Sequence, residues 1–391
     1  MKKGYTIKGI LLSNNNWVKF AIKYKNRIRP SIFSTINKLL SCRENTRGYH
    51  QYSCSNPKCS FTKKIPHTCK TKACSSCGRK ATEIWIEKTN RTLPNTAWQH
   101  ITFTMPCQLW GFFWCNRFLL NYIAMIAANC VKRIADKKGV IPGIFIAIHT
   151  FGRALNRNVH IHLSTTVGGV SKDLTKFHKL YFDHQVLKNM WKYGIIDLFR
   201  KAAKTDGFVI TPEVNRLLNH TYTFNHFLDD LSKQKWVVHC NQSSDNHDKI
   251  VSYLGRYVKR PAIAESKLRH YDGHSVVFRH LNHKTKKYCN LTLSIEEFIG
   301  NFIQHIPDKG FRMIRYYGFL ANRLSGKLLD VIYKLLGQTK KAGELLTHFA
   351  DMIKKYFGYD PLSCSVCKYP LLLRFIYFGR ASCFFNFSRN S

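Results

Sequence analysis

Acidic residues are scarce in this chain. Only 22 aspartates and glutamates stand against 62 lysines and arginines, which gives a formal net charge of +40 spread along the whole length. A protein so poor in negative charge attracts polyanions, and nucleic acid is the leading candidate partner. An anionic membrane surface is the rival partner on charge alone.

Long apolar runs are also missing. No stretch reaches the roughly 18 residues that a membrane-spanning helix needs. The best attempt, Phe118 to Val131, is interrupted by Asn121 and Asn129, and we expect it to be a buried helix. No membrane partner is therefore expected. The first residues carry two lysines but only a short apolar stretch follows them, which is a poor signal peptide. A cytoplasmic location is predicted.

A nucleotide-binding loop of the form G-x-x-x-x-G-K-[ST] is absent as well, so the sequence offers no site of that kind for using nucleotide energy. The length of 391 residues suits two or three domains, and a hydrophobic content of 45% suffices for packed cores. Because no export signal is recognised, the fourteen cysteines are expected to be thiols and metal ligands rather than disulfides.

What the sequence does contain is a cysteine-dense segment at residues 42–77, set among turn residues. Cys74 and Cys77 form a C-x-x-C knuckle, and Cys54 and Cys59 form a wider pair. Four thiolates suit tetrahedral zinc, and so short a segment needs a bound ion to fold. The zinc is expected to be structural, because four thiolates leave no open position for chemistry.

Two more cysteines of this segment, Cys42 and Cys69, leave three interpretations open. They could complete a second site, exchange with the first set, or be buried thiols. Basic residues surround the cysteines and could hold DNA. They are Lys63, Lys64, Lys70, Lys72, Arg79 and Lys80.

A second C-x-x-C knuckle, Cys364 and Cys367, stands near the end of the chain without a matching cysteine pair beside it. Cys383 and His348 are its nearest potential partners in the sequence. The knuckle could be half of a metal site or an unliganded pair, and both interpretations stay open.

Two histidines flank one bulky apolar residue at His160, Ile161 and His162. The motif follows an apolar run, Ile144 to Ile148, and precedes an expected Gly168-Gly169 turn. Side chains two apart on a strand project to the same face, so the two imidazoles can share one divalent ion. The third ligand is not identifiable. Candidates by sequence are His247, Asp248 and Glu265.

Two tyrosines, Tyr253 and Tyr257, stand four residues apart in a basic, helix-compatible stretch. Residues at this spacing are neighbours on a helix, so both phenols could approach one reaction centre. A metal ion nearby would stabilise charge developing on phosphorus, which suggests DNA cleavage through a phosphotyrosine. Positive charge for holding DNA is available beside them, from Arg256, Lys259 and Arg260. The tandem Tyr316-Tyr317 is a competing nucleophile that we rank as structural.

The arrangement of expected elements favours an α+β fold, because antiparallel-looking strands are segregated from helices. We expect an N-terminal helical segment at 1–40, with a helix boundary at Pro30, and a zinc-binding domain at 41–82. A catalytic domain carrying the tyrosine helix is expected at 95–275, with a C-terminal region at 276–391. A helix-like stretch is expected from Leu109 to Lys137, and a hairpin from Val276 to Leu293.

Taken in order, these motifs resemble the rolling-circle transposases of the insertion sequence 91 family, a two-tyrosine branch of the HUH endonucleases. The resemblance covers roughly residues 40 to 370. Its motifs are residues 69–77, His149-Thr150-Phe151-Gly152-Arg153 before the histidine pair, residues 253–263, His305-Ile306-Pro307 and Arg315-Tyr316-Tyr317-Gly318.

The resemblance implies a zinc-binding domain followed by a catalytic domain with the antiparallel sheet of HUH endonucleases and flanking helices. It implies that His160 and His162 bind Mg²⁺ or Mn²⁺, and that Tyr253 and Tyr257 attack single-stranded DNA at transposon ends. One 5′-phosphotyrosine would form and a 3′-hydroxyl would be released. The chain departs from the family pattern at Ala73, where a histidine is usual, so an imidazole zinc ligand is not expected there.

Three alternatives remain on the sequence alone. A plasmid rolling-circle replication initiator or relaxase would use the same chemistry on different DNA. A non-catalytic zinc-dependent DNA-binding protein would bind DNA unchanged when Tyr253 and Tyr257 become phenylalanine. A metal-dependent hydrolase would need an open metal site but no tyrosine.

Overall fold

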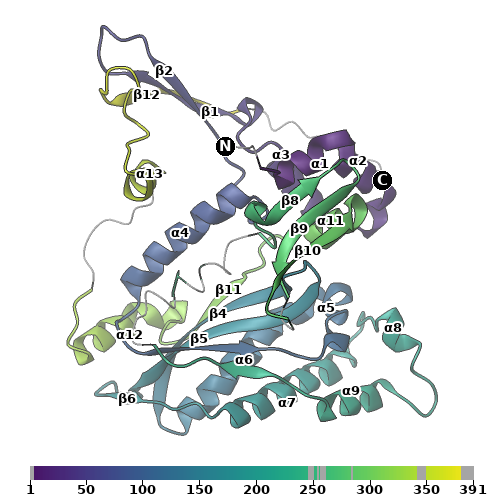
Figure 1. Ribbon diagram of the computed structural model, residues 1–391. Helices are drawn as coiled ribbons and strands as arrows, with labels where there is room; N and C mark the ends of the chain where they lie inside the picture. The colour runs from purple at the N-terminus through teal and green to yellow at the C-terminus, as the bar shows by residue number, and fades with distance from the viewer. Residues whose placement is uncertain are drawn as a thin grey trace. The chain divides into compact units, whose positions relative to one another are not determined.

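The computed structural model of the protein describes residues 4–244, 251–252, 255, 261–282, 285–340 and 349–379. The chain forms two compact units (Figure 1). Unit 1 draws on residues 1–88, 259–309 and 343–391, and unit 2 draws on residues 89–258 and 310–342. Both units are built from separated stretches of chain, so the stretch expected as one catalytic segment, 95–275, contributes to both of them.

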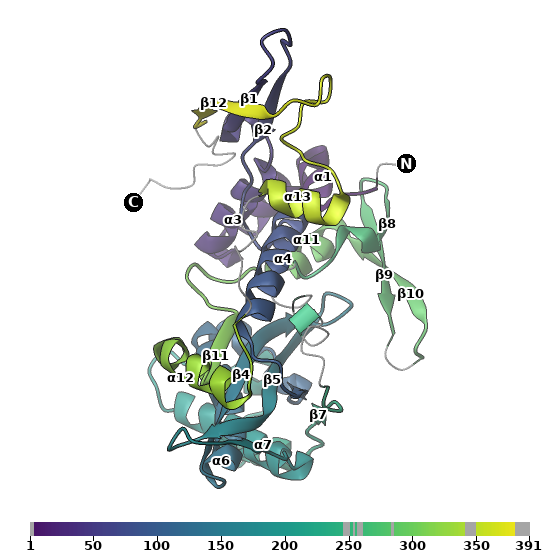
Figure 2. The same cartoon turned by 90° about the vertical axis from the view of Figure 1, so that its left-hand side faces the viewer.

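Unit 1 combines helices with two small antiparallel sheets, of strand order β12-β1-β2 and β10-β9-β8 (Figure 2). Its elements are α1 (Ile7–Leu12), α2 (Asn16–Lys23), α3 (Pro30–Leu40), β1 (Tyr49–Cys54), β2 (Thr62–Pro66), α4 (Ser75–Thr92), β8 (Leu268–Tyr271), β9 (Ser275–Leu281), β10 (Tyr288–Ser294), α11 (Ile295–Ile303), α13 (Phe349–Phe357) and β12 (Leu371–Tyr377). The last turn of α4 belongs to unit 2.

Two expectations for unit 1 are confirmed in detail. Helix α3 begins at Pro30, whose fixed φ and missing N–H suit the first helical position. Strands β9 and β10 pair in antiparallel register, with Ser275 opposite Ser294, as the alternating sequence predicted. Helix α11 follows directly because Ser294 and Glu297 form a capping box at its start.

Unit 2 is built on one antiparallel sheet of order β11-β4-β5-β3-β7, with β6 paired to β5. Its elements are β3 (Trp98–Phe103), α5 (Phe112–Cys115), α6 (Leu120–Asp136), β4 (Val140–Phe151), β5 (Arg157–Ser171), β6 (Phe177–Lys179), α7 (His184–Ala202), α8 (Pro212–Asn215), α9 (Phe224–Lys233), β7 (Val238–Cys240), β11 (Ile314–Gly318) and α12 (Asn322–Leu335). The expected α+β class, with antiparallel sheets and flanking helices, is confirmed.

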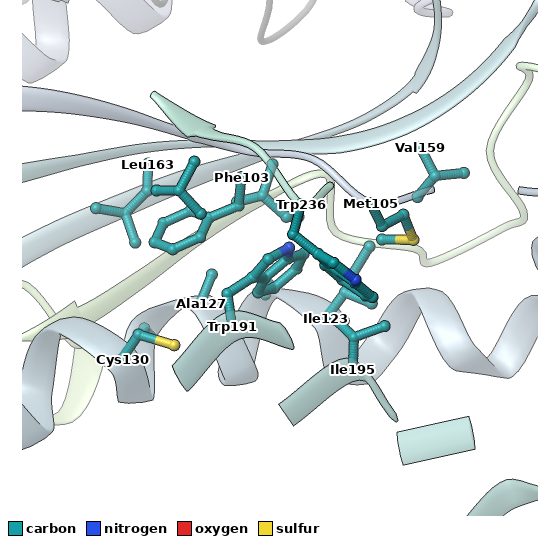
Figure 3. Close-up of a cluster of buried hydrophobic side chains, with 14 of the residues drawn as sticks. Phe103, Met105, Ile123, Ala127, Cys130, Val159, Leu163, Trp191, Ile195 and Trp236 are labelled. Carbon is teal, nitrogen blue, oxygen red and sulfur yellow. The ribbon is translucent and has the colours of Figure 1, made fainter. Parts of the chain in front are cut away.

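The core of unit 2 lies between one face of this sheet and helices α6 and α7. Phe103 of β3 packs on Trp191 of α7 with ring centroids 5.1 Å apart (Figure 3). The indole N–H of Trp191 donates to the Thr104 carbonyl at 2.6 Å, so the only polar atom of that ring is satisfied. Ile161 points into this core, as the alternation of the histidine strand predicted.

Helix α6 is shorter than the stretch expected from Leu109 to Lys137. The chain leaves helical geometry at Asn116. The side-chain nitrogen of Asn116 donates to the Val209 carbonyl at 2.7 Å, and its side-chain oxygen accepts from the Val209 amide at 2.8 Å. Residues 117–136 are long and apolar enough to cross a membrane by composition alone, but half of that window is buried inside the protein. Buried core helices meet the same criteria, and α6 packs on β4 and β5.

The expected turn at Gly168-Gly169 is wrong, because both glycines lie within β5, which runs on to Ser171. A Cβ at Gly168 would lie 2.5 Å from the Phe177 ring, and a Cβ at Gly169 would lie 2.7 Å from the Ile141 carbonyl oxygen. The glycines therefore permit close packing within the sheet, and they do not reverse the chain.

Candidate metal centres and catalytic site

The central hairpin of unit 2, β4 and β5, brings three histidines together. Its turn is tight: the Gly152 amide donates to the Asn156 carbonyl at 2.9 Å. A Cβ at Gly152 would lie 2.4 Å from the Asn156 side-chain oxygen. The resulting register sets His149 of β4 directly opposite His160 of β5, and His162 follows two residues later on the same face.

One nitrogen of each imidazole converges on a common point. The ligand atoms of His149, His160 and His162, here called the histidine cluster, all lie within 4.8 Å of one another. The Nε2 atoms of His160 and His162 are 3.1 Å apart. His149 and His162 are buried whereas His160 is partly exposed. Three imidazoles with one partly open side are a suitable donor set for a divalent transition ion.

Neighbouring groups orient two of these rings. The Nδ1 atom of His160 lies 3.0 Å from the Asn158 carbonyl oxygen, to which only a protonated nitrogen can donate. Nε2 of His160 therefore carries the free lone pair. On β3, Nε2 of His100 lies 3.1 Å from Nδ1 of His162, and Nδ1 of His100 lies 3.4 Å from the Ser164 hydroxyl. Such outer partners fix the tautomer of a ligating imidazole.

Three histidines of this face, His100, His160 and His162, have pKa values below their usual range. Burial lowers the pKa of His160 to about 4, although the Asn158 carbonyl acts in the opposite direction. Burial also lowers the pKa of His100 to about 4. For His162, burial and the nearby imidazoles, His149 first among them, hold the pKa well below its usual range. Only the neutral imidazole can bind a metal ion.

The sequence did not identify His149 as the third member. Of the three candidates that it offered, His247 and Asp248 lie outside the described residues. Glu265 accepts a hydrogen bond from the Ile7 amide at 3.0 Å, so its carboxylate contacts the start of α1 in unit 1. The sequence did contain a signal for His149. A short turn at residues 152–156 between two apolar strands fixes which residue faces His160.

Both proposed nucleophiles, Tyr253 and Tyr257, lie outside the described residues, and so do Arg256, Lys259 and Arg260. The described residues just before Tyr253, Val251 and Ser252, are helical, and Val251 is buried.

The competing tyrosine pair, Tyr316 and Tyr317, lies in strand β11 of the unit 2 sheet. Tyr317 of β11 pairs with Ile144 of β4 and packs on the core of unit 2. Burial raises the pKa of the Tyr317 phenol, although Arg315 acts in the opposite direction. The Arg315 guanidinium donates to the backbone and side-chain oxygens of Asn121 at 2.6 and 2.9 Å. These contacts agree with a structural role for this segment.

Eight cysteines of unit 1 form two separate groups of four. The first thiolate cluster contains Cys42, Cys69, Cys74 and Cys77, and the second thiolate cluster contains Cys54, Cys59, Cys364 and Cys367. The structure therefore does not bring together the expected quartet of Cys54, Cys59, Cys74 and Cys77. Each half of that quartet has a different pair of partners.

The first thiolate cluster has the geometry of a tetrahedral zinc site. Its sulfur atoms are 3.5 to 3.8 Å apart in the three contacts between Cys77 and Cys42, Cys77 and Cys69, and Cys74 and Cys42. A tetrahedral ion with Zn–S bonds of about 2.3 Å holds its sulfurs about 3.8 Å apart. Ala73 precedes the knuckle, and the four thiols need no imidazole in its place.

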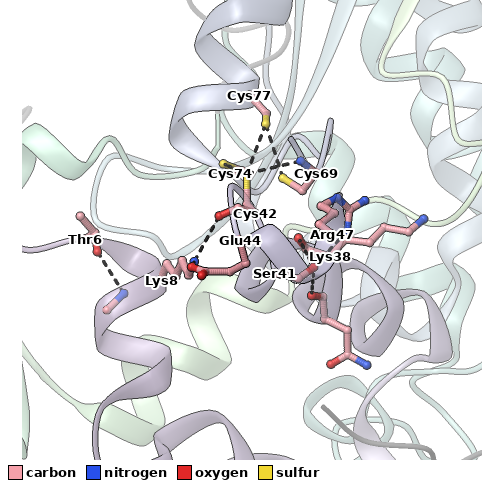
Figure 4. A network of polar contacts seen from close by, with 12 residues as sticks. Thr6, Lys8, Lys38, Ser41, Cys42, Glu44, Arg47, Cys69, Cys74 and Cys77 are labelled. Atoms are coloured by element: carbon pink, nitrogen blue, oxygen red, sulfur yellow. Dashed lines mark hydrogen bonds and ion pairs between the residues drawn. The ribbon is translucent and has the colours of Figure 1, made fainter. Parts of the chain in front are cut away.

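The chain around this cluster is fixed by polar contacts (Figure 4). The Lys8 ammonium donates to the Cys42 carbonyl at 3.1 Å and pairs with Glu44. The amide of Cys69 donates to the Cys42 sulfur at 3.3 Å.

Comparison with known proteins agrees with both parts of this architecture. Residues 12–105 match a family model described as "Transposase zinc-binding domain", and residues 143–327 match one described as "Putative transposase". The first range contains the first thiolate cluster, and the second contains the histidine cluster.

Two curated relatives match over most of their length. The chain is 35% identical to the transposase for insertion sequence element IS801 of Pseudomonas savastanoi pv. phaseolicola, over 94% of this chain and 89% of the relative. It is 27% identical to the protein named "Putative transposase y4qJ" of Sinorhizobium fredii (strain NBRC 101917 / NGR234), over 83% of this chain and 84% of the relative. No solved structure matches the chain.

Proposed function

The chain belongs to the transposases of the insertion sequence 91 family, and from this premise we propose that it nicks and rejoins single-stranded DNA through a 5′-phosphotyrosine. The observation that carries the proposal is the histidine cluster. Three imidazoles converge on one point of an antiparallel sheet, and one of them is partly exposed. A phosphodiester could reach an ion held there.

We propose that the histidine cluster binds one divalent ion, Mn²⁺ in preference to Mg²⁺. Mg²⁺ prefers oxygen ligands, whereas imidazole nitrogens suit transition ions. When bound, the ion would polarise a non-bridging phosphate oxygen and stabilise negative charge on phosphorus. The role of the chain is to keep the imidazoles neutral, with the Asn158 carbonyl orienting His160 and His100 orienting His162.

The nucleophiles in this proposal are Tyr253 and Tyr257, on the strength of the family resemblance and their spacing. A phenol oxygen forms a bond to phosphorus as the bond to the 3′ oxygen breaks. The phenol proton is lost and the leaving 3′ oxygen gains one, so a 5′-phosphotyrosine and a 3′-hydroxyl result. The reverse reaction rejoins the strand without an external energy source. Arg256, Lys259 and Arg260 would hold the phosphate backbone nearby.

Binding to DNA follows from membership of the family, and it agrees with the formal charge of +40. We propose that the substrate is single-stranded DNA at the ends of the mobile element and at the target. The proposed location is the cytoplasm, where bacterial DNA is accessible. A plasmid replication initiator or relaxase would share this chemistry, but both matching relatives bear transposase names.

Trapping of a covalent adduct tests the proposal. Purified protein is incubated with a labelled oligonucleotide that carries the element end and with Mn²⁺, and a denaturation-resistant protein–DNA species is sought. We expect an adduct that the Tyr253→Phe/Tyr257→Phe double variant and chelator both abolish. The matched control is Tyr316→Phe/Tyr317→Phe, which should still form it. An adduct that survives the Tyr253/Tyr257 substitutions would overturn the assignment. Binding of this DNA without any adduct would favour a non-catalytic DNA-binding protein.

A further inference from the structure

We propose that the second thiolate cluster binds a second structural zinc ion, which fastens the C-terminal strand β12 onto the hairpin of β1 and β2. Cys54 and Cys59 come from that hairpin, whereas Cys364 and Cys367 come from the segment just before β12. The C-terminal pair lies beyond the residues that match the transposase zinc-binding domain, which end at 105.

Distances between the sulfur atoms support a single tetrahedral site. The Cys54 and Cys367 sulfurs are 3.3 Å apart, and the Cys59 and Cys364 sulfurs are 3.9 Å apart. All four sulfurs lie within 4.8 Å of one another. These separations bracket the value of about 3.8 Å that four Zn–S bonds of about 2.3 Å require. They are far longer than a disulfide bond of about 2.05 Å, and all four cysteines are free.

Each pair of sulfurs is presented by a tight turn. In the hairpin, the Cys59 amide donates to the Asn56 carbonyl, and the Cys54 amide donates to the Phe61 carbonyl, both at 3.0 Å. The other turn closes where the Lys368 amide donates to the Cys364 carbonyl at 3.0 Å. Lys368 adopts the left-handed conformation with φ of 64°.

Backbone pairing continues from the cluster into the sheet. Strand β12 pairs antiparallel with β1, and Leu371 stands opposite Cys54. The Ser55 amide donates to the Pro370 carbonyl at 3.0 Å. The Lys63 ammonium adds a bond of 2.7 Å to the Pro361 carbonyl. The sulfurs thus lie where two segments about three hundred residues apart in sequence already meet, with Cys59 and Cys364 separated by 305 positions.

Apolar burial cannot hold this strand by itself. Leu371 is the one buried residue of β12, and the other six residues of the strand are exposed. A sheet of three strands with so little buried surface is marginal, and ordering a distant chain segment costs conformational entropy. A tetrathiolate zinc site supplies folding free energy and leaves no open position for chemistry. The role of this ion is therefore structural.

Measuring the metal content of the protein tests the proposal directly. The wild-type chain, purified without added zinc chelator, should hold two thiolate-bound zinc ions. Cobalt substitution should give a thiolate-to-cobalt charge-transfer band with the intensity of eight thiolates. Cys364→Ser/Cys367→Ser should halve both signals, and so should Cys54→Ser/Cys59→Ser. The quadruple variant should lose no more than either double variant, because all four residues hold one ion.

Controls separate loss of a ligand from loss of folding. Cys107→Ser/Cys115→Ser changes two exposed thiols outside both clusters and should keep the full metal content. Cys367→His retains a zinc ligand and should restore the second ion where Cys367→Ser loses it. The proposal also predicts that limited proteolysis cleaves between α13 and β12 much faster in the Cys364/Cys367 serine variant than in the wild type.

Three results would overturn the proposal. The first is one thiolate-bound zinc ion in the wild type that the Cys364/Cys367 substitutions leave unchanged. The second is additive metal loss in the quadruple variant, which would mean separate sites. The third is disulfide bonds among these cysteines in the metal-loaded protein, detected by mass after alkylation without reductant. None of these measurements uses DNA cleavage, so the outcome is independent of the proposed function.

Discussion

The histidine cluster of unit 2 and the first thiolate cluster of unit 1 both bring metal-donor atoms together. They differ in the number of these atoms and in their exposure. The thiolate cluster has four sulfurs at tetrahedral spacing, which fill the coordination of zinc. The histidine cluster has three nitrogens on a sheet with one partly exposed ring. A saturated site can only stabilise structure, whereas an unsaturated one can also bind substrate. Ligand number thus distinguishes a purely structural site from one with room for a further ligand.

The largest effect should follow from removing ligands of the first thiolate cluster, whose four sulfurs fill the coordination of zinc. Cys42→Ser/Cys77→Ser removes two of four thiolates from the first thiolate cluster. Structural zinc in small domains contributes about 10 kcal/mol or more, so we expect unit 1 to lose its zinc and its cooperative unfolding transition. Zinc analysis and differential scanning calorimetry measure both. Cys107→Ser is the control, and a normal unit 1 transition without zinc would contradict the structural role.

Removing the ligands of the histidine cluster should instead have a large effect on activity and a small effect on stability. His160→Ala/His162→Ala should slow adduct formation at least about 1,000-fold, equivalent to about 4 kcal/mol, because the ion that stabilises charge on phosphorus is lost. The melting temperature should change less than in the Cys42/Cys77 variant, since one of the two imidazoles is partly exposed and the hydrophobic core of unit 2 is unchanged. His178→Ala, on the exposed strand β6, is the control. Manganese-dependent adduct formation at the wild-type rate would refute the site.

Substitution also identifies the third ligand of the histidine cluster. His149→Ala should raise the Mn²⁺ concentration for half-maximal adduct formation by at least about 10-fold, because losing a direct ligand should weaken metal binding no less than losing an outer-shell partner, which costs about 10- to 100-fold. Glu265→Gln should leave it unchanged, because that carboxylate contacts the Ile7 amide in unit 1. The reverse pattern, with Glu265 required and His149 dispensable, would assign the ligand differently.

The smallest expected effect is a dependence of folding stability on pH. Folding holds the pKa of His100 at about 4, below its usual 6.5. The unfolded chain therefore binds more protons between these values, and stability falls as pH drops from 6.5 towards 4. At pH 5.5 this one group should cost about 1 kcal/mol relative to pH 7. Thermal unfolding of unit 2 without added Mn²⁺ measures the loss, and His100→Phe should reduce it. An identical pH dependence in that variant would exclude His100 as the cause.

Local sequence patterns predicted several local features of this protein correctly, although not at Gly168 and Gly169, which lie within β5 and form no turn. Pro30 begins α3, the alternating residues of 275–294 form a hairpin, and Ile161 is buried between two histidines that share a face. Each of these features depends on neighbours in the sequence. The break at Asn116 was missed because its cause is a contact with Val209, which lies 93 residues away.

Sequence could not predict which thiols meet. A C-x-x-C pair shows that two sulfurs are close, but it does not show which second pair completes the tetrahedron. Pairing by proximity in sequence joined Cys54 and Cys59 to the Cys74-Cys77 knuckle, whereas the fold joins them to a pair about three hundred residues later. The β12 pairing with β1 decides this, and periodicity carries no information on the partner of a strand.

A metal-dependent phosphotyrosine is detected most directly by mapping the residue that carries DNA. The adduct formed with Mn²⁺ is digested with nuclease and protease, and the modified peptide is sequenced by mass spectrometry. We expect a nucleotide attached to Tyr253 or Tyr257, and none when His160 and His162 are replaced by alanine. A nucleotide on any other residue, such as Tyr316, or an adduct that forms without the two histidines, would contradict it.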